Sequence, residues 1–171
     1  VVNPDNLMGE MQLLFDAGLS LDNLLLDRRA NVVLPYHPML DSLAESSRTE
    51  GTKIGTTKRG IGPTYADKAA RIGIRLGDLG RTEYLRTRLK EGLERANARL
   101  ERHGVEPLTI DFLLETCARW AESLKGRIVD TMPTIREAIQ GGQEVLLEGQ
   151  LGVMRDLDWG IPVPVEGGEG K

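Results

Sequence analysis

The chain has 171 residues, of which 40% are hydrophobic and 28% charged, and its formal net charge is −4 at pH 7. These values are typical of one globular domain with a substantial core, and the acidic balance argues against general nucleic-acid binding. No apolar run reaches the roughly 18 residues that a membrane span needs. We therefore expect no contact with a membrane. A single cysteine, Cys117, excludes an internal disulfide and predicts a reducing, cytoplasmic location.

The first eighteen residues predict an amphipathic helix. Asn3 and Pro4 suit the N-cap and the first helical position, and Gly18 suits the position after the last turn. The apolar residues between them keep the spacing of one helical face, which we expect to pack into the core. They are Leu7, Met11, Leu14 and Phe15.

Two short apolar runs follow, at residues 24–26 and 32–34, and both are of the strand type. A helix is predicted next, from about Pro38 to Arg48. His37 stands at its start, where a capping or partly exposed role is a better prediction than catalysis.

Residues 51–75, here called the basic segment, contain six basic residues and one acidic residue, Asp67, together with four glycines before Tyr65. Two interpretations stay open: a flexible surface loop, or a loop that binds phosphate through its amides, hydroxyls and cations. Thr64 as N-cap and Asp67 three residues later predict the start of a helix. Arg71 and Arg75 would then share one face of that helix. The segment lacks the P-loop pattern.

The second half of the chain is predicted to be mainly helical. Apolar residues hold a helical period over about 82–104 and again over 110–125, where Cys117 belongs to the buried stripe. A short helix is predicted over 133–140 and a strand over 144–148. No cluster has metal-ligand spacing, and we assign a structural role to Asp156 and Asp158, so we predict no metal site.

The run GTTKRGIGPTY from Gly55 to Tyr65, followed by DKAAR at 67–71 and GDL at 77–79, closely resembles the adenylosuccinate synthetase family. The resemblance covers residues 1–160, with the basic segment as the IMP-phosphate loop and helix. It implies an α/β fold, as the helix-rich central part of a mostly parallel-sheet nucleotide-binding fold. Members of this family are ligases of AMP biosynthesis that join IMP to L-aspartate, use GTP and Mg²⁺, and form homodimers.

The resemblance also implies roles for individual residues. Thr57 matches a threonine that binds the IMP phosphate, and Thr56 lies beside it. Arg71 matches an arginine that crosses the homodimer interface to the IMP of the partner subunit. Residues implied to support the phosphate or the dimer are Lys58, Arg59 and Arg75.

Two departures from the family pattern lie near the end of the chain. Where the family has EGAQG, with a glutamine that contacts IMP, residues 148–152 read EGQLG. Gln150 is therefore displaced by one position, and it keeps the contact only if the loop shifts. Residues 161–171 leave the pattern and are predicted to be an atypical tail, with Glu166 where a second phosphate-binding threonine would stand.

The catalytic base, the catalytic acid and the segments that bind guanine and aspartate in the family have no counterpart in this chain. The resemblance therefore implies that GTP and Mg²⁺ bind elsewhere in the family enzyme, and that the isolated chain is inactive. Two alternatives stay open. One is a related purine-monophosphate ligase of the 2-aminoadenylosuccinate synthetase type, and the other is a non-catalytic module that binds phosphate or another protein.

Overall fold

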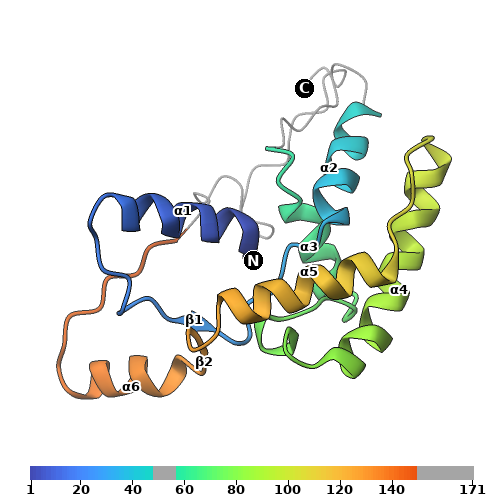
Figure 1. Ribbon diagram of the computed structural model, residues 1–171. Helices are drawn as coiled ribbons and strands as arrows, with labels where there is room; N and C mark the ends of the chain where they lie inside the picture. Colours follow the sequence, from blue (N-terminus) through green and yellow to red (C-terminus); the bar gives the residue numbers. More distant parts are fainter. Residues whose placement is uncertain (48–56, 150–171) are drawn as a thin grey trace, which may run out of the picture.

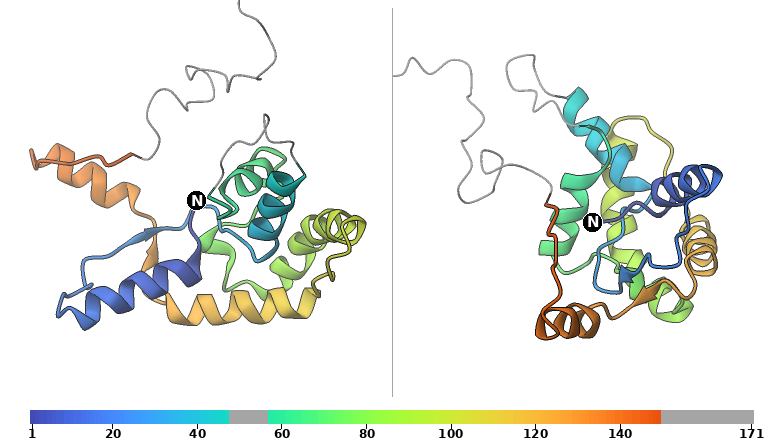
Figure 2. Two further views of the ribbon diagram at one scale, coloured as in Figure 1. Left: turned by 90° about the horizontal axis from the view of Figure 1, so that it is seen from above. Right: turned by 90° about the vertical axis from the view of Figure 1, so that its left-hand side faces the viewer.

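A computed structural model describes residues 1–47 and 57–149 (Figure 1). Helices α2 to α5 pack together on one side of the molecule, and α1 and α6 flank a small sheet on the other (Figures 1 and 2). In chain order the elements are α1 (Pro4–Asp16), β1 (Leu26–Asp27), α2 (Tyr36–Ser46), α3 (Ile61–Ala69), the 3₁₀ helix η2 (Leu76–Asp78), α4 (Thr82–Arg102), α5 (Ile110–Ser123), β2 (Ile128–Val129) and α6 (Met132–Gln140).

The ends of the helices follow from local sequence. The Asn3 side chain accepts a hydrogen bond from the Asn6 N–H at 3.2 Å, so Asn3 caps α1 as predicted. Thr109 caps α5 in the same way, through the Phe112 N–H at 3.2 Å. The chain leaves α4 through Gly104, whose φ of 69° is readily adopted only by a residue without a side chain.

Extended segments cross the middle of the molecule, but regular strands are short. β1 and β2 pair in parallel, with Leu26 beside Ile128. The backbone that follows β1 runs antiparallel to the start of η2, through hydrogen bonds such as Leu76 N–H to the Ala30 carbonyl at 2.9 Å. The predicted strand at 32–34 contributes one isolated bridge, from Val32 to Val2. The fold is therefore helix-rich α/β with a small parallel sheet, as predicted.

The hydrophobic core lies where α2, α4 and α5 meet the extended segments. The helical stripes predicted for α4 and α5 are buried there, as the spacing requires. Fully buried members include Leu34, Tyr36, Ile74, Leu76, Leu85, Leu89, Leu100, Leu113, Trp120 and Leu124. This core fixes α2 against α4 and α5 and provides the platform for α3.

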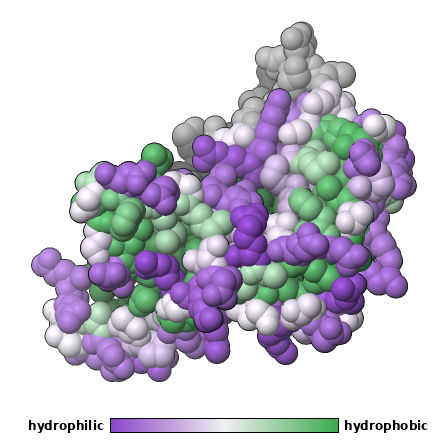
Figure 3. Space-filling view, viewed as in Figure 1, coloured by the Kyte–Doolittle hydropathy of each residue, from purple (hydrophilic) through white to green (hydrophobic). Residues whose placement is uncertain are grey.

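Two predictions about apolar residues are wrong. Residues 144–148 form no strand, and Leu146 and Leu147 are 94% and 87% exposed. A strand needs a neighbour for its backbone hydrogen bonds, and no described segment offers one here. On α1, Phe15 is 68% exposed, because the end of this helix extends past the core. The space-filling view shows apolar atoms on this side of the surface (Figure 3).

A hydrogen-bonded carboxylate joins the ends of β1 and β2. Asp27 accepts from the Thr131 hydroxyl at 2.8 Å and from the Arg29 backbone N–H at 2.7 Å. These bonds, the one from Thr131 foremost, lower the Asp27 pKa from 3.8 to about 2. Because the folded pKa lies below the ordinary value, this stabilisation is complete above about pH 4 and is lost as the pH falls to about 2.

We therefore expect Asp27→Asn to flatten the dependence of the unfolding free energy on pH between about 4 and 2. Denaturant titrations at a series of pH values measure this slope. Asp16→Asn, at the exposed end of α1, is the matched control and should keep the wild-type slope. A wild-type slope in Asp27→Asn would contradict the lowered pKa of Asp27.

Candidate functional site

The described part of the basic segment starts at Thr57 and surrounds α3. Thr57, Lys58 and Arg59 are exposed, as are Arg71 and Arg75 beyond the other end of the helix. Among the described residues other than glycine, only Lys58 and Arg71 have a positive φ, of 55° and 63°. Such backbone conformations cost about 1–3 kcal/mol and concentrate at functional sites. Both residues lie in the basic segment, so their backbone conformations support a functional site there.

The start of α3 differs from the prediction. The helix begins at Ile61, with Gly60 at the N-cap position, and not at Thr64. The Thr64 side chain is buried, and its hydroxyl donates to the Gly60 carbonyl at 2.8 Å. Neither Thr64 nor Asp67 forms a capping box, because both side chains are held by contacts with α2.

At Gly60 the backbone of the basic segment lies directly against that of α2. A Cβ atom at this position would lie 2.6 Å from the Pro38 nitrogen and 2.7 Å from the His37 carbonyl carbon. The Gly60 N–H donates to Asp41 Oδ2 at 3.0 Å, and its φ is 77°. The end of the loop that carries Thr57 is thus seated on the first turns of α2.

The other end of α3 is closed around Arg71. The Asp67 carbonyl accepts from the N–H groups of Ile72 and Gly73, each at 3.0 Å, and Arg71 lies in the left-handed turn between. The Arg88 guanidinium on α4 donates to the Arg71 carbonyl at 2.5 Å. The Arg71 backbone is therefore fixed while its side chain points into solvent-exposed surroundings.

Arg71 and Arg75 do not share a helical face, so that prediction is wrong. α3 ends at Ala69, and Arg75 forms an antiparallel bridge with Asn31 before η2. The reason is that α3 is followed by a left-handed turn at Arg71, so the helix does not continue to Arg75. Sequence spacing alone carried no sign of it.

His37 is also placed differently from the prediction, since it is 1% exposed. Its two ring nitrogens lie within hydrogen-bond distance of Leu34 N, Thr64 Oγ1 and Asp67 Oδ2. Tyr36 and Arg88 were not singled out from the sequence. One signal could have pointed to a buried partner such as Tyr36: Asp67 is the single acidic residue of the basic segment, and an isolated acid there suggests a specific partner.

Thr57 and Arg71 lie beyond opposite ends of α3. A helix of this length spans roughly 14 Å. Lys58 and Arg59 follow Thr57 directly in the chain, whereas Arg71 lies beyond the other end of α3. Thr56, Gln150, Asp156 and Asp158 lie outside the described residues.

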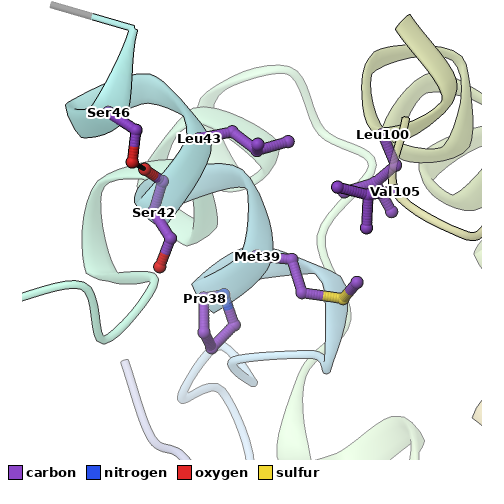
Figure 4. Close-up of a pocket in the computed structure, with 7 residues that line it drawn as sticks. All are labelled: Pro38, Met39, Ser42, Leu43, Ser46, Leu100 and Val105. Carbon is purple, nitrogen blue, oxygen red and sulfur yellow. Dashed lines mark hydrogen bonds between the residues drawn. The ribbon is translucent and has the colours of Figure 1, made fainter. Parts of the chain in front are cut away.

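A groove of about 380 Å³ lies between α2 and the end of α4 (Figure 4). It is lined by Pro38, Met39, Ser42, Leu43, Ser46, Leu100 and Val105. Figure 4 shows Met39 and Leu43 of α2 opposite Leu100 and Val105. This lining has no cation, so the groove does not suit a phosphate group.

Other candidate groups have structural roles. Cys117 is fully buried, and burial raises its pKa to about 12, so the thiolate that would react is scarce at neutral pH, as predicted. Within residues 1–47 and 57–149, no group of three or more His, Cys, Asp or Glu side chains could hold a metal ion. In the same residues no helix has the length and apolar character of a membrane span.

Comparison with known proteins gives a consistent result. The family model described as adenylosuccinate synthetase matches residues 1–163. Over 161 residues the chain is 45% identical to adenylosuccinate synthetase 1 of Methanosarcina acetivorans and 43% identical to adenylosuccinate synthetase of Ligilactobacillus salivarius. These matches cover 94% of this chain but only 38% and 37% of the two relatives.

A solved structure of fully ligated adenylosuccinate synthetase from Plasmodium falciparum superposes with a TM-score of 0.78 at 31% identity. It is covered over 37% of its length, and 94% of this chain is matched. The chain therefore spans less than two fifths of the relatives that it matches.

Proposed function

The chain belongs to the adenylosuccinate synthetase family, and we propose that it is the part of such a ligase that binds the IMP phosphate and forms the dimer contact. The complete enzyme would join IMP to L-aspartate with GTP, giving adenylosuccinate, GDP and phosphate in AMP biosynthesis. The single observation that carries the proposal is the basic segment, where exposed donors and cations lie at both ends of an anchored α3.

The chemistry of this segment suits a phosphate group. The Thr57 hydroxyl can donate one hydrogen bond to a phosphate oxygen, and Lys58 and Arg59 lower the energy of the dianion by charge. Arg71 offers two parallel N–H donors, the geometry in which guanidinium binds phosphate best. We assign Thr56 and Gln150 to the same IMP site and Arg75 to support of the dimer.

The dimer is part of the proposal. Thr57 and Arg71 lie beyond opposite ends of α3, which spans roughly 14 Å, so the Thr57 and Arg71 that bind one phosphate would come from different chains. A two-fold axis would bring Arg71 of one subunit to Thr57 of its partner, since a symmetric interface uses each contact twice. The site would then be complete only in the homodimer.

We assign no catalytic residue to this chain, and we propose that it is inactive alone. The described residues do not fit a Mg²⁺ site. No role proposed for them depends on the metal, which with GTP would serve the phosphoryl transfer in the remaining part of the enzyme. We propose a cytoplasmic location, one ligase part over residues 1–160, and an atypical tail over 161–171.

Comparing IMP with inosine tests the proposed site, because the two ligands differ only in the phosphate. We expect the chain to bind IMP on the order of tenfold more tightly than inosine, as loss of a charge-assisted contact predicts. NMR titration measures both affinities. Thr57→Val, which removes the hydroxyl and keeps the shape, should reduce this preference, while Thr134→Val on exposed α6 should not.

Equal affinities for IMP and inosine in the wild-type chain would refute the phosphate site. An IMP preference that survives Thr57→Val would instead favour a phosphate-binding module of another kind. Adenylosuccinate formation by the purified chain, followed by its ultraviolet absorbance with GTP, Mg²⁺ and aspartate present, would contradict the proposed inactivity.

A further inference from the structure

A buried polar network connects the first turn of α2 to the last turn of α3. The Tyr36 hydroxyl donates to Asp67 Oδ2 at 2.9 Å, and His37 Nε2 lies 2.9 Å from the same oxygen. Tyr36 and His37 are 2% and 1% exposed, while the Asp67 side chain is 19% exposed. Two donors from consecutive residues of α2 therefore converge on one carboxylate oxygen of α3.

The hydrogen bonds around His37 fix where its proton lies. His37 Nδ1 accepts from the Leu34 N–H at 2.8 Å, so the neutral ring carries its proton on Nε2 and donates it to Asp67. Burial, and then the charge of Asp67, raise the pKa of Tyr36 well above its ordinary value, so the phenol stays a donor. Each polar group of the network thus has a defined role.

Residues of α2 and of the network make contacts at both ends of α3. At the N-terminal end, the Gly60 N–H donates to Asp41, and Gly60 packs against the His37 backbone. At the C-terminal end, the Asp67 carbonyl accepts the hydrogen bonds that close the turn containing Arg71. Asp67 is therefore bound to α2 through its side chain and to the Arg71 turn through its main chain. A shift of Asp67 would move the Arg71 backbone with it.

We propose that Tyr36, His37 and Asp67 are positioning residues, which set the geometry of the phosphate site by fixing α3, and with it the Thr57 loop and the Arg71 turn, against α2. This inference rests on the proposed function. None of the three is assigned a contact with phosphate. Buried polar pairs often add little stability over apolar residues of the same size, but they can specify one arrangement of packed elements. Here the arrangement specified is the position of α3.

Two substitutions of the network test this role, with a control of similar burial elsewhere. Tyr36→Phe removes one donor and keeps the ring, and Asp67→Asn replaces the shared acceptor without changing its size. Asn97→Ala is the control, because Asn97 makes two partly buried hydrogen bonds to the Leu108 backbone, at 2.8 and 3.0 Å, away from α3. Each variant is titrated with IMP and with inosine, and its melting temperature is measured.

The ratio of the inosine Kd to the IMP Kd is the decisive quantity. We expect Asp67→Asn to lower this ratio on the order of tenfold, since small displacements of a binding group have large effects, and Tyr36→Phe to lower it about threefold. Inosine affinity should stay unchanged. Asn97→Ala should lower the melting temperature and leave the ratio unchanged.

The possible results separate the two proposals. If the wild-type chain prefers IMP and both network variants keep that preference, the positioning role is refuted and the proposed function stands. If the wild-type chain shows no preference, the proposed function is refuted, and the positioning role with it. Should Asp67→Asn fail to fold, Tyr36→Phe alone decides, because its ring packing is retained.

Discussion

Gly60→Ala is expected to destabilise the fold strongly. The new methyl group would lie 2.6–2.8 Å from backbone and Cβ atoms of His37 and Pro38, which belong to α2 and cannot move independently. The φ of 77° adds a cost of about 1–2 kcal/mol for any residue with a side chain. Together with overpacking of about 1–3 kcal/mol, we expect a loss of about 2–5 kcal/mol of unfolding free energy.

Gly62→Ala is the matched control for this prediction. Gly62 lies two residues later, in the first turn of α3, and a Cβ there would have no atom within 4 Å. Alanine favours the helix over glycine by about 0.5–1 kcal/mol. Chemical denaturation should therefore show that Gly60→Ala lowers the unfolding free energy and that Gly62→Ala raises it. Equal effects would contradict the seating of Gly60 on α2.

Arg71→Gly is expected to abolish phosphate-specific binding while the fold is kept or stabilised. Glycine is the residue that usually occupies the left-handed position after a helix. Replacing Arg71 by glycine relieves a conformation that costs about 1 kcal/mol, but it removes a guanidinium whose bonds to a charged group contribute about 1.5–3 kcal/mol. We expect the IMP affinity to fall at least about tenfold, to that of inosine.

Arg71→Ala separates these two effects. It removes the same guanidinium and keeps a Cβ in the left-handed turn, so it should lose binding equally but unfold more easily than Arg71→Gly by about 1 kcal/mol. Arg102→Ala, at the exposed end of α4, controls for lost charge and should bind IMP normally. Normal IMP binding in Arg71→Ala would exclude this residue from the site.

Mixing variants tests whether Arg71 acts on the partner subunit. Neither Thr57→Val nor Arg71→Ala should form a complete site alone. In mixed dimers, one site combines both substitutions and the other has neither. Random mixing should therefore restore binding at about a quarter of the sites, because half of the dimers are mixed. No recovery under conditions where subunits exchange would show that Thr57 and Arg71 serve the same chain.

The sequence by itself determined most of the helices and the family. Capping residues and the 3.6-residue period are local signals, so α1, α4, α5 and α6 and the buried stripe with Cys117 could be predicted. The run from Gly55 to Tyr65 identified the family because its residue order is long and specific.

The tertiary structure alone decided the geometry of the site. The early start of α3 depends on the contact of Gly60 with α2, and the burial of His37 depends on Asp67, thirty positions further along the chain. The turn at Arg71 depends on Arg88 of α4. Such contacts between residues far apart in sequence leave no periodic pattern. The sequence therefore indicated which residues are candidates for the site, and packing against α2 and α4 fixed the positions of those that the structure describes.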